Sequence, residues 1–173
     1  MKLNLVERGV LDPLAESSQE SIFINDIPSP IHHISLFDNT KPGADIILNI
    51  IKASLKSIEV IESKKPAGAG ANKFQLEKAA EGDVSILALG DCGSCTTWVI
   101  LDAIRLEKKG VPTLSICSHK FAPFARKLAK AHGAPDLRIF EIEHPVAGLN
   151  PDKVKEKTNV IIPEIEKIFY KSD

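Results

Sequence analysis

The sequence predicts a three-layer, doubly wound α/β domain. Its parallel sheet has about five strands in the flavodoxin-like order 2-1-3-4-5. Short apolar runs alternate along the chain with stretches of helical periodicity, which favours parallel strands joined by right-handed crossovers. One run, residues 84–89, is almost continuously apolar, as is typical of a strand covered on both faces. The length of 173 residues fits one such domain.

Residues 1–30 show no sustained period and contain clusters of Ser and Pro. We therefore expect an N-terminal arm that packs on the domain of residues 31–173 or on a neighbouring molecule. Short runs of apolar or alternating residues predict the five strands. They cover residues 31–37, 57–62, 84–89, 111–117 and 137–142.

Helical periodicity fills the intervals between the strands. The expected helices cover residues 44–56, 72–80, about 93–109, 121–132 and a final stretch from residue 150. Gly110 and Gly133 stand where C-terminal caps are expected. Asn150-Pro151 is a typical helix start, and Pro163 is expected to bend or interrupt the last helix.

Composition narrows the class of protein. The 22 Lys+Arg against 23 Asp+Glu give a net charge of -1, so no cationic field favours nucleic acid or an anionic membrane. No apolar run approaches the ~20 residues of a membrane span. Charged residues interrupt the first eight positions, where a signal peptide needs an apolar stretch, and the odd number of cysteines is unlike a disulfide scaffold. We expect a cytoplasmic protein without nucleic-acid or membrane partners.

The residues with the most distinctive chemistry follow the predicted strands. In a sheet of this order, ligands bind at the carboxyl ends of the strands, between the first and the third. Cys92, Cys95 and His144 lie in loops that end there and are the expected catalytic residues. The expected substrate-binding residues are Asp38, Asn39, Lys41, Asp91, Gly93, Ser94 and His119.

Cys92 and Cys95 are placed to act as a pair of thiols. A cysteine at a helix N-terminus meets unpaired backbone N–H groups and the positive end of the helix dipole, and both favour the thiolate. A second cysteine one turn later can attack an adduct on the first. We therefore predict that Cys92 is the nucleophile and Cys95 the resolving thiol. The neighbouring Asp91 carboxylate opposes a thiolate unless its charge is paired.

Several of these residues also have ordinary structural explanations. Cys-x-x-Cys can be half of a zinc site, for which Cys117, His119 and His144 are the available partners, or a purely structural pair. The prediction is nevertheless no metal and no cofactor, apart from an external thiol reductant. Lys41 could be a solvated turn lysine, and Cys117 is expected to be buried packing.

Around this motif the chain resembles the UGSC family of (seleno)proteins, named for a U-G-S-C motif in which U is selenocysteine. Cys92-Gly93-Ser94-Cys95 matches it, with cysteine in the selenocysteine position. Further matching stretches are residues 36–42, 65–68, 89–91, 102–113 and 144–149. A more distant resemblance, to the C-terminal part of the glycine reductase selenoprotein B subunit, implies that Cys92 attacks a small electrophile to form a thioether or thioester adduct.

Three functions from different classes remain open. The first is a reductase in which Cys92 attacks a small, carboxylate-bearing substrate and Cys95 closes a disulfide that a thioredoxin-like partner reduces. The second is a cysteine hydrolase or lyase acting on an amide, nitrile or thioester, with His144 as proton shuttle. The third is a non-enzymatic thiol- or metal-binding subunit of a larger complex. A homo- or hetero-oligomer is expected.

Overall fold

The computed structural model of the protein describes residues 21–170 and confirms the predicted fold class. Five parallel strands form one sheet in the order β2-β1-β3-β4-β5. In chain order the elements are β1 (His33–Asp38), α1 (Ala44–Ser54), β2 (Glu59–Lys64), α2 (Lys73–Ala79), β3 (Val84–Gly90), α3 (Gly93–Glu107), β4 (Thr113–Ser118), α4 (Ala122–Ala131), β5 (Ile139–Ile142) and α5 (Pro151–Phe169).

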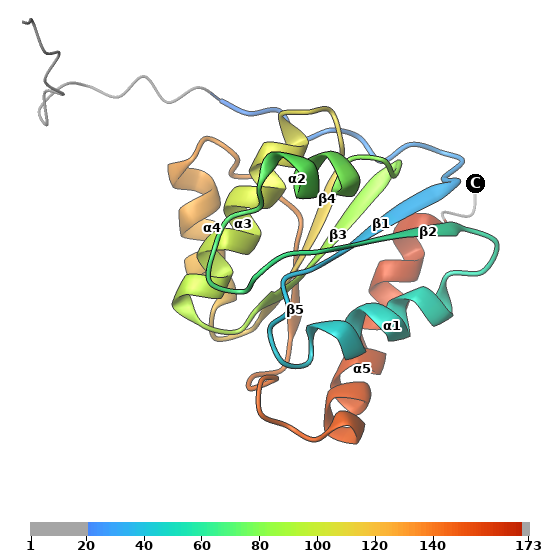
Figure 1. Ribbon diagram of the computed structural model, residues 1–173, viewed down its shortest axis with the longest axis vertical. Coiled ribbons are helices and arrows are strands. Elements are labelled where there is room, and N and C mark those ends of the chain that lie inside the picture. The colour runs from blue at the N-terminus through green and yellow to red at the C-terminus, as the bar shows by residue number, and fades with distance from the viewer. Residues whose placement is uncertain (1–20, 171–173) are drawn as a thin grey trace, which may run out of the picture.

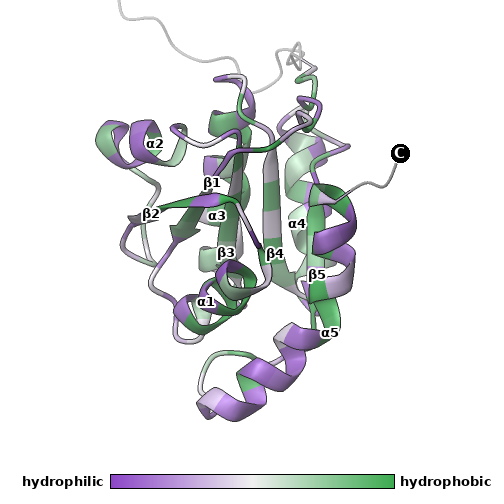
Figure 2. Ribbon diagram, turned by 90° about the vertical axis from the view of Figure 1, so that its right-hand side faces the viewer, coloured by the Kyte–Doolittle hydropathy of each residue, from purple (hydrophilic) through white to green (hydrophobic). Residues whose placement is uncertain are grey.

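Helices cover both faces of the sheet (Figure 1). α1 and α5 pack together on one face, and α2, α3 and α4 lie on the other. Each helical layer encloses its own apolar cluster against the sheet. Every residue of β3 and of β4 is buried, as expected for central parallel strands. Figure 2 shows the complementary pattern, with apolar residues along strands such as β5 and polar residues on the outer side of α5.

The edge strand β2 differs from the prediction. It spans Glu59–Lys64 rather than residues 57–62. Ser57 adopts a left-handed backbone conformation with a φ of 63°, so it belongs to the turn before the strand. Parallel pairing with β1 then continues until Lys64 lies opposite Asp38. The sequence pattern misplaced this strand because only one of its six residues is buried.

Of the two effects expected at Pro163, the interruption of the last helix is wrong, and the bend stays a prediction. α5 runs from Pro151 to Phe169 with Pro163 inside it. A proline removes the hydrogen bond to the carbonyl four residues earlier, here that of Asn159. Asn159 is exposed, so water can satisfy that carbonyl. Within residues 21–170, neither α5 nor any shorter helix is long and apolar enough to cross a bilayer.

The predicted arm lies partly outside the described residues. Residues 21–30 form neither helix nor strand and pack against the domain. The Ile22 N–H donates to the Gly133 carbonyl at 2.7 Å. The backbone N–H and side-chain amide of Asn25 both donate to the Glu107 carboxylate at 2.8 Å, and Arg138 donates to the Asn25 carbonyl at 2.6 Å. This part of the arm is therefore held at the edge of the sheet where the strands begin.

Candidate active site

The parallel pairing brings four loops to one edge of the sheet. Gly90 at the end of β3 lies opposite Cys117, and Ser118 at the end of β4 lies opposite Ile142. Asp38 at the end of β1 pairs with Ala88 of β3. We call the region formed by the loops after β1, β3, β4 and β5 the carboxyl edge. The predicted site residues lie on these loops and on the first turn of α3.

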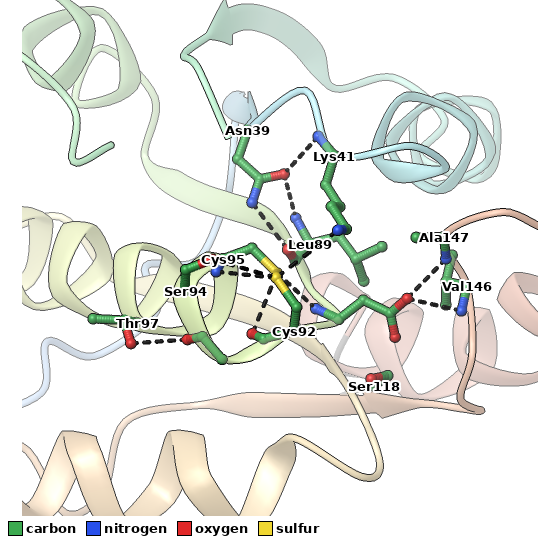
Figure 3. Close-up of a disulfide and its surroundings, with 12 residues drawn as sticks. Asn39, Lys41, Leu89, Cys92, Ser94, Cys95, Thr97, Ser118, Val146 and Ala147 are labelled. Atoms are coloured by element: carbon green, nitrogen blue, oxygen red, sulfur yellow. Dashed lines mark hydrogen bonds between the residues drawn. A yellow bond between two sulfur atoms is a disulfide. The ribbon is translucent and has the colours of Figure 1, made fainter. Parts of the chain in front are cut away.

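Cys92 and Cys95 open α3 at the carboxyl edge (Figure 3). Cys92 is the N-cap, with extended backbone, and Cys95 lies in the first turn. Their sulfur atoms lie at disulfide distance, and their Cα atoms are 5.5 Å apart, a usual separation for bonded cysteines. Cys92 is partly exposed, whereas Cys95 is 1% exposed. Solvent can therefore reach only the first sulfur of the pair.

The Cys92 sulfur is surrounded by groups that favour a negative charge. The Cys95 N–H donates to it at 3.3 Å, and the Ser94 hydroxyl lies 3.6 Å away. The Lys41 ammonium, from the loop after β1, lies at 3.8 Å. Within residues 21–170 no carboxylate forms an ion pair with Lys41. The lysine charge is thus available to the sulfur and to an incoming anion.

Asp91, although next to Cys92 in sequence, turns its carboxylate toward the loop after β5. Its Oδ2 accepts the backbone N–H groups of Val146 and Ala147 at 3.0 and 2.8 Å. Its Oδ1 lies 2.8 Å from His144 Nδ1. Burial alone raises the pKa of Asp91, but hydrogen bonds from Ser118, the two N–H groups and His144 outweigh it, so the pKa lies below its usual value. The charge that could oppose a Cys92 thiolate is therefore paired.

His144 and His119 meet on the same side of the carboxyl edge. The His144 backbone N–H donates to His119 Nδ1 at 2.9 Å, and the two ring centroids are 6.3 Å apart. Phe121 packs on the His144 ring at a centroid distance of 5.7 Å. Lys157 of α5 donates to the Pro145 carbonyl at 3.0 Å and so holds the backbone of this loop.

Asn39 and Asp38 hold the loop that carries Lys41. The Asn39 side chain accepts the Leu89 N–H at 2.8 Å and donates to the Leu89 carbonyl at 2.9 Å, which ties the loop to β3. The Asp38 carboxylate accepts the Thr40 N–H at 2.7 Å and lies 3.5 Å from Lys64 Nζ. Substrate binding by these two residues stays a prediction, since the contacts described here are internal.

Gly93 and Ser94 form the outer surface of the thiol turn. Both residues are exposed, and a Cβ built on Gly93 would meet nothing within 4 Å. Beside Lys41 an open pocket of about 280 Å³ is lined by Asp38, Thr40, Lys41, Pro42, Asp45 and Lys64. The surface at Gly93 is therefore open, whereas the pocket beside Lys41 is lined by neither cysteine.

Cys117 has the opposite environment to Cys92. It is fully buried beneath Gly90, and burial raises the pKa of its thiol to about 12. No group of three or more His, Cys, Asp or Glu side chains within residues 21–170 is arranged to hold a metal ion. The zinc alternative therefore lacks an assembled ligand set in the part of the chain that the structure describes.

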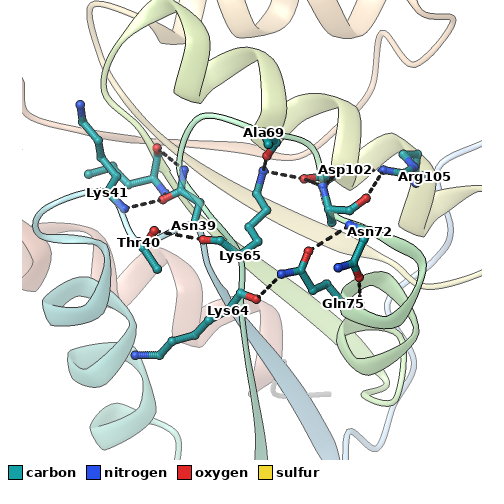
Figure 4. Close-up of polar contacts among 12 residues, drawn as sticks. Asn39, Thr40, Lys41, Lys64, Lys65, Ala69, Asn72, Gln75, Asp102 and Arg105 are labelled. Carbon is teal, nitrogen blue, oxygen red and sulfur yellow. Dashed lines mark hydrogen bonds and ion pairs between the residues drawn. The ribbon is translucent and has the colours of Figure 1, made fainter.

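A buried ion pair that the sequence analysis missed connects α3 to the loop after β2 (Figure 4). The Lys65 ammonium lies 2.7 Å from the Asp102 carboxylate and donates to the Ala69 carbonyl at 2.7 Å. Burial lowers the pKa of Lys65, and the hydrogen bond and charge of Asp102 offset this only in part. The pair fastens the loop after β2 to the helix that carries the thiols. Its signal in the sequence was a lone aspartate among the apolar positions of α3.

Comparison with known proteins identifies one family. The model of the UGSC family matches residues 9–171, which is nearly the whole chain. A comparison with curated proteins found no match. The resemblance to the glycine reductase selenoprotein B subunit is not tested by these findings and stays a prediction.

Proposed function

The chain belongs to the UGSC family, and from this premise we propose that it is a thiol-dependent oxidoreductase. Cys92 attacks a small, carboxylate-bearing electrophile, and Cys95 resolves the adduct by forming a disulfide. The observation that carries the proposal is the pair of sulfur atoms at disulfide distance, one partly exposed and the other buried. A buried second thiol cannot be the site of first attack, but it is correctly placed for resolution.

The surroundings of Cys92 support a nucleophilic thiolate. A lysine ammonium, a backbone N–H and a hydroxyl lie within 3.8 Å of its sulfur, at the positive end of α3. The same lysine can bind a carboxylate of the substrate. Lys64 lines the pocket beside it together with Asp38 and Asp45, and it lies 3.5 Å from the Asp38 carboxylate, so Lys41 is the cation that supports this role. The proposed carboxylate-bearing substrate is supported by the Lys41 ammonium near the Cys92 sulfur.

The reaction balances without a bound cofactor. The Cys92 thiolate bonds to an electrophilic carbon or sulfur and expels a leaving group with its electron pair. The Cys95 thiolate then attacks the Cys92 sulfur, and the substrate fragment leaves with an electron pair and takes up a proton. The two thiols lose two electrons in forming the disulfide, and the substrate gains these two electrons.

Regeneration requires an external dithiol, and a thioredoxin-like protein has the required chemistry. Its thiolate attacks the accessible Cys92 sulfur, Cys95 leaves as a thiol, and the second thiol of the donor releases Cys92. This cycle fits a reducing compartment such as the cytoplasm, where such donors are present.

Alkylation and disulfide exchange test the proposal without knowledge of the substrate. Iodoacetamide should label Cys92 of the reduced protein at neutral pH faster than free cysteine, and Cys117 should stay unlabelled as the internal control. Oxidised glutathione should convert the wild type to the internal disulfide. In Cys95→Ser it should leave a mixed disulfide on Cys92, visible by intact mass.

Cys92→Ser should show neither fast alkylation nor a stable glutathione adduct. The proposal fails if neither thiol of the pair reacts faster than free cysteine. It also fails if the Cys95→Ser variant accumulates no adduct, because Cys95 would then have nothing to resolve.

A second candidate function is a cysteine hydrolase or lyase with His144 as proton shuttle. The contact between Asp91 and His144, at 2.8 Å, favours it because it holds an oriented imidazole against the residue that precedes Cys92. The two candidates differ in their need for Cys95. Turnover that persists in Cys95→Ser without reductant would indicate the hydrolytic or lyase reaction.

A further inference from the structure

The hydrogen bonds around Asp91 determine which nitrogen of His144 carries the proton. Asp91 is a carboxylate whose side chain is 2% exposed, so its oxygens can only accept. His144 Nδ1 lies 2.8 Å from Oδ1 and must therefore donate. The Ser118 hydroxyl lies 3.1 Å from the same Nδ1 and is also bonded to Asp91, which leaves its oxygen lone pairs to face the ring. Neutral His144 thus keeps its proton on Nδ1 and presents an unprotonated Nε2.

His119 is held in the opposite tautomer. The backbone N–H of His144 can only donate, and it points at His119 Nδ1 at 2.9 Å. His119 Nδ1 is therefore the acceptor, and neutral His119 carries its proton on Nε2. Within residues 21–170 neither Nε2 atom has a hydrogen-bond partner.

We propose that His144 and His119 form an acceptor–donor pair at the carboxyl edge, in which His144 Nε2 exchanges protons with the substrate and His119 Nε2–H donates a hydrogen bond to it. Asp91 is the positioning residue that assigns these roles. This inference rests on the proposed function in one respect: the proposed function locates the reaction at the carboxyl edge. It extends that function to a substrate whose reacting group bears both an oxygen or nitrogen acceptor and an atom that gains or loses a proton.

The proton balance is simple. When Cys92 displaces a leaving group, the doubly protonated form of His144 gives its Nε2 proton to that group and becomes neutral, while its Nδ1–H continues to donate a hydrogen bond to Asp91. His119 keeps its proton throughout and only donates the hydrogen bond. His144 regains a proton from water before the next cycle.

Nitrogen-15 NMR of the uniformly labelled full chain reads the tautomers directly. The spectra are recorded at a pH where neither ring shows the doubly protonated pattern. Long-range proton–nitrogen correlations should then assign the proton to Nδ1 of His144 and to Nε2 of His119, each in at least roughly tenfold excess. The exposed ring of His132 supplies the reference for a solvated histidine. A His144 spectrum that is Nε2-protonated, or that matches the mixture of His132, would overturn the proposal.

Asp91→Asn provides a sharper test. Two backbone N–H groups face the Oδ2 position, so the carbonyl oxygen of the new amide must occupy it, and its NH₂ group must face His144 Nδ1. The His144 tautomer should therefore invert to Nε2–H while His119 stays unchanged. Retention of Nδ1–H in a folded Asp91→Asn protein would refute the positioning role. Asp83→Asn, which also replaces a carboxylate bonded to two backbone N–H groups, is the matched control and should change neither ring.

The experiment separates this inference from the proposed function. Cys92 alkylation depends on the thiol, whereas the tautomers are read without any reaction. Slow alkylation with the expected tautomers would refute only the thiol function, and the reverse result would refute only the histidine pair. If Asp91→Asn does not fold, Ser118→Ala replaces it: the Asp91 carboxylate stays, so His144 must remain Nδ1-protonated, and loss of that tautomer counts against the proposal.

Discussion

The two edges of the sheet each contain a buried carboxylate at an end of α3, with different consequences. At the edge where the strands begin, which we call the amino edge, Glu107 accepts hydrogen bonds from Asn25 and Thr113 and lies 3.5 Å from the Arg138 guanidinium as an ion pair. At the carboxyl edge, Asp91 accepts from Ser118, His144 and two backbone N–H groups. Both carboxylates are almost completely buried and fully bonded.

The two carboxylates differ in whether their hydrogen-bond partners can exchange protons near neutral pH. The donors to Glu107 are an amide, a hydroxyl and backbone groups, with a guanidinium as ion-pair partner, and none of these groups exchanges protons near neutral pH. The partner of Asp91 is an imidazole whose second nitrogen has no partner among residues 21–170. At the amino edge the bonded carboxylate holds neighbouring segments together. At the carboxyl edge the same kind of bonding orients a histidine, to which we assign the proposed proton transfer.

The largest expected effect is on stability, at the amino edge. Glu107→Ala removes a buried charge and leaves Arg138 and the bonded donors without their acceptor. We expect the free energy of unfolding to fall by about 3–5 kcal/mol in urea titrations, with the Cys92 alkylation rate of the folded protein unchanged. Glu62→Ala, in an exposed pair with Lys52, is the control and should cost less than about 1 kcal/mol. A Glu107→Ala protein as stable as the control would contradict the structural role of Glu107 at the amino edge.

The next effect tests how tightly the carboxyl edge is packed. A Cβ on Gly90 would lie 2.6 Å from the Cys117 sulfur and 2.9 Å from the Thr96 hydroxyl. Gly90→Ala should therefore lower the free energy of unfolding by about 1–3 kcal/mol. Adding Cys117→Ala should restore part of the loss, because it removes the nearest atom. Gly93→Ala, where a Cβ meets open space, is the control, and a comparable loss there would contradict the packing explanation.

A reactivity effect without a stability effect is expected at Lys41. Its ammonium lies 3.8 Å from the Cys92 sulfur, where a unit charge is worth about 1 kcal/mol in water. Lys41→Met should slow iodoacetamide labelling of Cys92 roughly fivefold and leave urea unfolding unchanged. Lys64→Met, which removes a lysine from the same pocket, should leave the labelling rate as it is. Equal rates in wild type and Lys41→Met would show that the lysine does not stabilise the thiolate.

The smallest effect is on the acid dependence of stability. Hydrogen bonds hold the pKa of Asp91 below its unfolded value although burial opposes them. Its stabilising contribution is therefore present above the unfolded pKa and is lost as the pH falls through the folded pKa. Between about pH 6 and about pH 3, wild type should lose more unfolding free energy than Asp91→Asn. Identical slopes would mean that the Asp91 carboxylate gains nothing from its partners in the folded state.

The fold was predictable where burial was complete. β3 reads as one apolar run because helices cover both its faces, and the spacing of helices and strands specified the parallel order. β2 was misplaced because an edge strand that is mostly exposed carries little pattern. The interruption at Pro163 was not realised because the carbonyl that loses its partner belongs to an exposed residue.

The candidate site also contains features that the sequence predicted and features that it did not. The thiol pair could be found because both cysteines and the helix that they open are local in sequence. Asp91 was noted only as a charge that opposes a thiolate, and its partners on the loop after β5 could not be read from the chain. The pair of Lys65 and Asp102 was missed for the same reason, since a loop and a helix supply one partner each.

Short-range patterns in the chain, namely periodicity, turn residues and the Cys-x-x-Cys spacing, were sufficient for most strands and helices and for the thiol turn, because each depends on neighbours a few residues apart. The layered fold and the strand order were then expected from general rules for parallel sheets, although the strands that pair are distant in the chain. The direction of the Asp91 carboxylate, the pairing of two histidines from different loops and the approach of Lys41 to a sulfur were decided only by tertiary structure. A hydrogen bond depends on atoms within about 3 Å of one another, and only the packed sheet brings four separate loops to that distance.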